Sequence, residues 1–164
     1  MPSVKLRPAV RALILDEQDR ILLCRHVLSR PAGRVVWAAA GGGIEQGETP
    51  LAALRREVRE EVGLVLGADP PHVWHQEAVG PGYAAGYEGV SNDYFLVRTT
   101  TFTPRGSLSD EQLAAEAIRG LKWWHLREIA SYAGSDLFSP RDLATPLTAL
   151  VATGPPARPV RLGV

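Results

Sequence analysis

Three glutamates, Glu57, Glu60 and Glu61, lie within one short stretch of the sequence. Apolar residues recur at helical spacing from Pro50 to Val62, so carboxylates three and four positions apart share one face of the predicted helix. Such like-charged pairs cost roughly 0.2–0.5 kcal/mol each, and the negative end of the helix dipole disfavours them further. A hard divalent cation would remove this cost and leave positions open for phosphate oxygens. The alternative is a solvated face on which interspersed arginines neutralise the glutamates.

The segment before this helix is rich in glycine, at positions 41 to 43 and at Gly47. Glycine lets a backbone approach a phosphate closely or turn a carbonyl toward a metal ion. Thr49 has the character of an N-cap residue, with Pro50 at the first helical position, and Gly63 suits a left-handed C-terminal residue. These signals predict a helix over residues 50–62, entered from a loop that suits a phosphate ligand.

This segment resembles the Nudix signature, in which a glycine, five residues, a glutamate and seven residues precede Arg-Glu-aliphatic-any-Glu-Glu-any-Gly-aliphatic. The matching residues are Gly42, Glu48, Arg56, Glu57, Val58, Glu60, Glu61, Gly63 and Leu64. Ala40 departs from the many family members that have proline there, but the change removes no ligand. The resemblance implies an α/β fold of the Nudix type, an α/β/α sandwich with a mixed sheet between helices. It also implies a metal-dependent pyrophosphohydrolase.

The resemblance assigns roles to residues of the helix and the loop. It implies that Glu57, Glu60 and Glu61 hold Mg²⁺ or Mn²⁺, with the carbonyl of Gly41 as a further ligand, and Glu60 and Glu61 are the first choices. In such proteins Arg56 pairs with a carboxylate and orients it, while Glu48 supports the loop. The expected catalytic residues are Glu57, Glu61, Arg56 and a general base outside the helix.

Glu116 is the candidate for this distant base. It lies seven residues before Trp123, and related proteins carry a loop glutamate upstream of a similar tryptophan strand. The alternative is a solvated carboxylate on a short helix together with Asp110 and Glu111.

Substrate contacts must come largely from outside the glutamate helix. Tyr83 and Tyr87 lie in the most glycine-rich loop of the chain and are expected to stack on a base or cover the site, the alternative being exposed loop aromatics. Several arginines have the charge to bind phosphates, among them Arg25. The residues predicted to bind substrate are Arg25, Gly42, Gly43, Tyr83 and Tyr87.

The remaining elements follow from hydrophobic patterning and turn residues. We predict a hairpin of two strands over 8–16 and 21–25 and a loop over 26–34. Further strands are predicted over 35–39, 72–79, 93–102 and 121–125, and a helix begins at Ser139-Pro140. Residues 109–118 suit a short helix or an ordered loop. Residues 1–153 are expected to form a single Nudix domain, followed by an extended tail over 154–164.

The N-terminal residues lack the apolar run of a signal peptide and no segment approaches 18 uninterrupted apolar residues, so a cytoplasmic protein with a small-molecule nucleotide substrate is expected. Eighteen basic and eighteen acidic residues cancel, so no nucleic-acid or membrane partner is expected. The single cysteine, Cys24, lies in an apolar strand and is expected in the core, and none of the four histidines is assigned a role. His72 and His75 are expected on opposite faces of their strand. A homodimer is possible by analogy with the family.

Three other functions compete with a hydrolase of nucleoside diphosphate derivatives. A non-catalytic sensor on the same scaffold would bind such a nucleotide, although binding alone does not require three clustered carboxylates. An isoprenoid diphosphate isomerase would require a catalytic cysteine, and Cys24 is not placed like one. Messenger-RNA decapping would be expected with a basic, aromatic-rich extension, which the sequence lacks.

Overall fold

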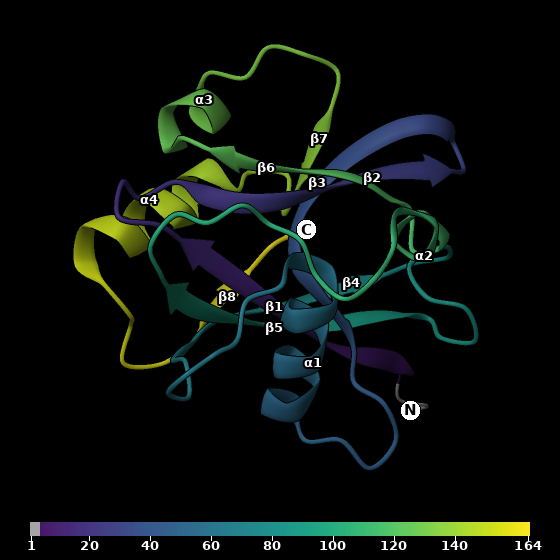
Figure 1. Cartoon of the computed structure of the whole chain (residues 1–164). Coiled ribbons are helices and arrows are strands. Elements are labelled where there is room, and N and C mark those ends of the chain that lie inside the picture. Colours follow the sequence, from purple (N-terminus) through teal and green to yellow (C-terminus); the bar gives the residue numbers. More distant parts are fainter. Residues whose placement is uncertain (1–3) are drawn as a thin grey trace.

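The computed structural model describes residues 4–164 and, within them, shows a mixed sheet between two layers of helices (Figure 1). The strands are β1 (Leu6–Leu15), β2 (Ile21–Ser29), β3 (Ala32–Gly43), β4 (His72–Val79), β5 (Gly89–Arg98), β6 (Ile118–Trp124), β7 (Leu137–Ser139) and β8 (Val160–Leu162). The helices are α1 (Pro50–Val62), α2 (Asp110–Ala115), α3 (Leu126–Ala130) and α4 (Ala144–Thr153).

The sheet has the strand order β6-β2-β3-β1-β5-β4-β8, with β7 paired to β3. β1 and β5 run parallel along their whole length, while β4 pairs antiparallel with β5. The predicted hairpin of β1 and β2 is wrong beyond its turn, because the two strands pair only at Leu15 and Ile21. β3 lies between them and pairs with both. The glycines of β3 therefore lie beside β1, in the middle of the sheet.

Two separate apolar clusters confirm the α/β/α sandwich. On one face, α1 and α2 pack on the sheet through buried residues that include Leu54, Val58 and Leu113. On the other face, α3 and α4 contribute residues such as Ile129 and Leu147. Alternate side chains of β1 enter opposite clusters, as the period of a strand requires.

Helix α1 has the predicted bounds and the predicted caps. The Thr49 hydroxyl accepts a hydrogen bond from the backbone N–H of Ala52 at 3.2 Å. Gly63 ends the helix with φ 81°, a left-handed conformation that costs glycine little. Leu54, Val58 and Val62 are buried against the sheet. The helix is thereby fixed at both ends and along one face.

Several predicted boundaries are wrong, in each case because pairing between distant segments extends or ends an element. The expected loop over 26–34 is mostly strand, since β2 reaches Ser29 and β3 starts at Ala32. The helix expected from Ser139 starts instead at Ala144, because Ser139 belongs to strand β7 and pairs there with Ala38 of β3.

Two other side-chain placements bear on the predictions. An irregular register between His72 and Trp74 brings His72 and His75 onto the same carboxylate oxygen of Asp93, at 3.0 and 2.7 Å. The expectation that these histidines face opposite ways is therefore wrong. Trp124 lies in the core beside Trp37, and its neighbour Trp123 packs on the other face.

The C-terminal segment contributes to the sheet. Residues 160–162, within the expected extended tail, form β8, which pairs in parallel with β4 at the edge of the sheet (Figure 1). Among residues 4–164, no helix has both the length and the apolar character needed to cross a bilayer.

Candidate active site

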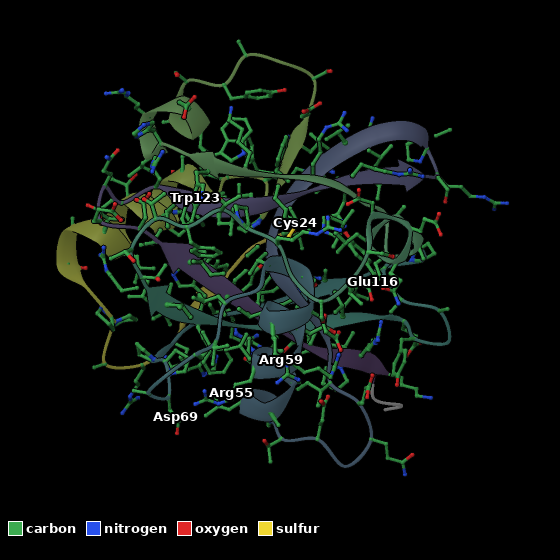
Figure 2. All side chains as sticks on the ribbon, viewed as in Figure 1. Cys24, Arg55, Arg59, Asp69, Glu116 and Trp123 are labelled. Atoms are coloured by element: carbon green, nitrogen blue, oxygen red, sulfur yellow. The ribbon has the colours of Figure 1, made fainter. Side chains whose placement is uncertain are left out.

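The carboxylates of three residues meet beside the glycines of β3, on the face of the sheet that α1 covers. Glu57 and Glu61 lie one turn apart on α1, and Glu116 is the residue at which α2 ends. One ligand oxygen from each lies within 4.8 Å of the others. Figure 2 shows Glu116 beside α2, on the side of the sheet that α1 covers. We call Glu57, Glu61 and Glu116 the carboxylate group.

Burial gives the carboxylate group unusual electrostatics. Glu61 is 1% exposed and Glu57 7% exposed, whereas Glu116 is exposed. Burial, and then the negative charge of Glu57, raise the pKa of Glu61 to about 9, against an opposing effect of the Arg11 guanidinium. Partial desolvation of its carboxyl group, followed by the negative charges of Glu57 and Glu60, also raises the pKa of Glu116. Without a cation, the group therefore holds at least one proton near neutral pH.

Arg56 ties the loop to the helix beside this group. Its Nε and Nη2 donate to the two carboxylate oxygens of Glu48 at 2.7 and 2.9 Å. Its Nη1 donates to Glu57 Oε1 at 3.0 Å, and its Nη2 also donates to the Gly43 carbonyl at 3.2 Å. Arg56 thus contacts the carboxylates of both Glu48 and Glu57, while its catalytic role stays a prediction.

The glycines of β3 form a wall against which the carboxylates pack. A Cβ atom on Gly42 would lie 2.6 Å from Glu57 Oε1. A Cβ atom on Gly41 would lie 2.0 Å from the backbone carbonyl oxygen of Val10. The φ angle of Gly41, 150°, is also one that residues other than glycine rarely adopt. The backbone N–H of Gly41 donates to Glu61 Oε2 at 3.4 Å. Side chains at these positions would occupy the space of the carboxylates or of β1.

Two expected metal ligands lie outside the carboxylate group. The nearest cation to Glu60 is Arg56, whose Nη1 is 3.6 Å from Glu60 Oε2. The Gly41 carbonyl accepts a hydrogen bond from Arg11 Nη1 at 3.4 Å. The ligand roles of Glu60 and Gly41 stay predictions.

The carboxylate group fits a divalent cation. Glu61 Oε1 is buried and has no hydrogen-bond partner among the described residues. A buried carboxylate oxygen without a partner is costly, and oxygen donors are the ligands that Mg²⁺ and Mn²⁺ prefer. The residues that would hold the ion are Glu57, Glu61 and Glu116.

Two cavities lie on opposite faces of the sheet, and only the second, on the face that α1 covers, adjoins the site. The first, of about 190 Å³, lies on the sheet and is lined by Arg7, Arg11, Gly42, Gly43 and Tyr83, among others. We call it the sheet cavity. The second, of about 530 Å³, is lined by residues that include Glu61, Arg119 and Gly120.

The other residues predicted to bind substrate lie in three different surroundings. Tyr83 lines the sheet cavity, whereas the Tyr87 ring lies 5.0 Å from the Lys5 ammonium group. Arg25 lies close to Gly120, because a Cβ atom there would be 3.8 Å from the Arg25 Cβ. The substrate-binding roles of Arg25, Tyr83 and Tyr87 stay predictions.

Cys24 is a core residue, as predicted. It is 1% exposed, and burial followed by the charge of Glu61 raises the pKa of its thiol. A buried, protonated thiol is a poor nucleophile, which disfavours the isomerase alternative.

Sequence reasoning missed the polar residues on the sheet itself, chiefly Gln76 and Asn92. The period of a strand does place Arg7 and Arg11 of β1 on one face. However, no local pattern shows that Gln76 and Asn92 face each other across β4 and β5 beside these arginines.

Comparisons with known proteins agree with this architecture. The NUDIX domain model matches residues 5–142. An RNA pyrophosphohydrolase from Gluconacetobacter diazotrophicus is 31% identical over 117 residues, which cover 65% of this chain and 70% of that protein. The nucleoside triphosphatase NudI from Enterobacter sp. is 39% identical over 75 residues, 44% of this chain and 53% of that protein.

The structural comparison concerns the fold alone. The E. coli ORF135 protein in its solution structure is 22% identical, with a TM-score of 0.66 over 96% of this chain and 100% of that chain. The chain spans about half of the NudI relative and 70% of the Gluconacetobacter relative. The domain match spans most of the chain, and the signature helix and glycine wall lie within it, so the chain belongs to the NUDIX family.

Proposed function

We propose that the chain is a metal-dependent hydrolase that cleaves the diphosphate linkage of a nucleoside diphosphate joined to another group. This class includes nucleoside triphosphates, nucleotide sugars and ADP-ribose. The observation that carries the proposal is the carboxylate group, whose ligand oxygens lie within 4.8 Å of one another. Binding a nucleotide without chemistry would not require three carboxylates so close together.

Cleavage of a diphosphate requires charge neutralisation at the phosphate, an oriented water and an acceptor for the proton of that water. A bound Mg²⁺ or Mn²⁺ supplies positive charge to the phosphate oxygens. Within the chain, Arg56 holds Glu57 in place through the 3.0 Å hydrogen bond.

Glu116 is the residue we propose to accept the proton from the attacking water. Its exposure gives access to solvent, and its raised pKa brings it closer to the range in which a base works at neutral pH. The same carboxylate belongs to the group that fits a cation. A variant must therefore be assayed for metal affinity as well as for turnover.

A 5′-triphosphate or diphosphate end of RNA is a second candidate substrate. It is favoured by the relatives named RNA pyrophosphohydrolase, which include a protein 31% identical over 117 residues. This candidate departs from the expectation of no nucleic-acid partner that the balanced charge suggested. A free nucleotide and an RNA end share the same diphosphate chemistry.

Product release from a substrate panel tests the proposal. The panel contains nucleoside triphosphates, nucleotide sugars, ADP-ribose and 5′-triphosphate RNA, each with Mg²⁺ or Mn²⁺. We expect turnover of one class, lost in Glu61→Gln and kept in Glu111→Gln, which changes an exposed carboxylate of α2. Tight binding across the panel without turnover would instead support a sensor.

A further inference from the structure

Glu116 reaches the carboxylate group from a turn of one residue. Glu116 is the cap residue that ends α2, β6 begins at Ile118, and only Ala117 lies between them. Ala117 has a φ of 66°, a left-handed conformation that residues with a Cβ atom rarely adopt. A single alanine therefore sets the direction in which the chain leaves α2, next to the residue that meets Glu57 and Glu61.

This conformation is unusual within the chain. Among residues 4–164, the other non-glycine residue with a positive φ is Asp19, at 58°. Asp19 lies between β1 and β2, and aspartate tolerates this conformation because its short polar side chain can bond to the nearby backbone. Alanine has no such compensation. A residue strained in this way persists only where its surroundings impose the conformation, and such residues cluster at functional sites.

Hydrogen bonds on both sides of the turn impose the conformation of Ala117. Its N–H donates to the Ala114 carbonyl at 2.9 Å, in the last turn of α2. Its carbonyl accepts from the Val27 N–H at 2.8 Å, which extends the contact between β6 and β2 by one residue. Leu113 and Ile118 are buried on either side, at 6% and 3% exposed. Both flanking elements are thus fixed, and the turn between them has little freedom.

The start of α2 is tied to the end of α1. In the segment that leads into α2, the Ser107 N–H donates to the Arg59 carbonyl at 3.4 Å, and the Leu108 N–H donates to the Glu60 carbonyl at 3.1 Å. A Cβ atom on Gly106 would lie 2.0 Å from the Glu60 carbonyl oxygen, so this segment lies directly on α1. Because α2 is anchored at its start, the turn that follows it decides where its cap residue lies.

We propose that Ala117 is a positioning residue, whose left-handed turn holds Glu116 within the carboxylate group. This inference rests on the proposed function, in which Glu116 accepts the proton of the attacking water or helps to hold the cation. Ala117 contacts neither the cation nor the substrate and acts only through Glu116. A residue that adopts a positive φ should therefore preserve the site, whereas one that cannot should displace Glu116.

Ala117→Pro tests the turn, with Ala117→Gly as the matched variant. The proline ring fixes φ at about −65° and excludes the left-handed turn, whereas glycine adopts it readily. For both variants and for Glu116→Gln, we would measure kcat on the substrate found with the panel, and Mn²⁺ affinity by calorimetry without substrate. Ala117→Pro should lower whichever of these quantities Glu116→Gln lowers, by about 10- to 100-fold. Ala117→Gly should stay close to the unaltered protein.

A double variant separates positioning from a general loss of structure. Ala117→Pro combined with Glu116→Gln should be no worse than Glu116→Gln alone, because a displaced glutamate and an absent one have the same effect. A further loss in the double variant would mean that the proline damages the site in another way, and would overturn the proposal. Unchanged kcat and Mn²⁺ affinity in Ala117→Pro would also overturn it, as would a Glu116→Gln variant without effect on either quantity.

A second substitution applies if Ala117→Pro does not fold, which urea unfolding would show. Ala117→Val keeps the N–H donor, but a β-branched residue strongly disfavours a positive φ. The same pattern is then expected, and normal values in Ala117→Val would contradict the proposal. A lack of hydrolysis across the substrate panel would overturn only the hydrolase proposal, because the Mn²⁺ affinities would still decide whether Ala117 acts through Glu116.

Discussion

Arg56 and Glu48 form a bidentate ion pair, with Nε to Oε2 at 2.7 Å and Nη2 to Oε1 at 2.9 Å. The pair closes the glycine loop onto α1, and the remaining nitrogen of Arg56 holds Glu57. The hydrogen bonds from Arg56 and from the Glu45 backbone lower the pKa of Glu48 to about 2. One guanidinium thus couples the loop to a member of the carboxylate group.

Arg56→Lys should impair activity or metal affinity by about 10- to 100-fold. A lysine ammonium group cannot reproduce the planar fork that engages Glu48 and Glu57 together. Steady-state kinetics over a Mg²⁺ titration would measure the loss.

Arg55→Lys is the matched control for that substitution. Arg55 is the adjacent residue, but it pairs with Asp69 at 2.7 Å, away from the carboxylate group (Figure 2). Near-normal kinetics are expected for this variant. Equal losses in both variants would mean that any arginine change on α1 perturbs the fold, and that Arg56 has no special role.

Glu116→Gln should lower kcat by about 100-fold or more if Glu116 is the base. The amide cannot take the proton of the attacking water, but it keeps a similar shape. Metal affinity, measured separately by calorimetry, should then change little, whereas a weakened affinity would identify Glu116 as a ligand. Unchanged kcat and affinity would remove it from the site chemistry.

The parts of this molecule that are predictable from sequence are those with local causes. The caps at Thr49 and Gly63 act within the helix they bound, so α1 has the predicted ends. The position of Glu116 depends on the pairing of β6 with β2. The sequence alone could not show this pairing, and Glu116 was predicted only from the resemblance to proteins with a loop glutamate before a tryptophan strand. The hydrogen bond from Gln76 to the Gly163 carbonyl could not be predicted, because the two residues are 87 positions apart and meet only in the folded sheet.

Alanine at Gly41 and at Gly42 should have different consequences although the positions are adjacent. At Gly41 the new Cβ would lie 2.0 Å from a backbone oxygen of β1, so we expect destabilisation of about 1–3 kcal/mol. At Gly42 the close neighbour is the Glu57 carboxylate, a side chain that can move. Gly42→Ala should therefore keep most of its stability and lose activity, which denaturant unfolding and kinetics would show. The opposite pattern would contradict the proposed wall.

The stability of the metal-free protein should fall as the pH rises from about 7 to 9. The folded-state pKa of Glu61 is raised from 4.5 to about 9, so over this range the folded protein holds a proton that the unfolded chain has released. Its contribution to stability is full below the unfolded value and is lost as the pH rises through the folded value. The raised pKa of Glu116 acts in the same direction.

Glu61→Gln should flatten this pH dependence, because a glutamine does not titrate. One proton corresponds to a slope of at most about 1.4 kcal/mol per pH unit. Urea unfolding in EDTA at several pH values would compare the variant with the unaltered protein, with Glu111→Gln as the exposed control. Parallel curves for all three proteins would mean that Glu61 is ionised in the folded state. In that case, the Arg11 guanidinium and the Gly41 amide would stabilise its charge more than burial opposes it.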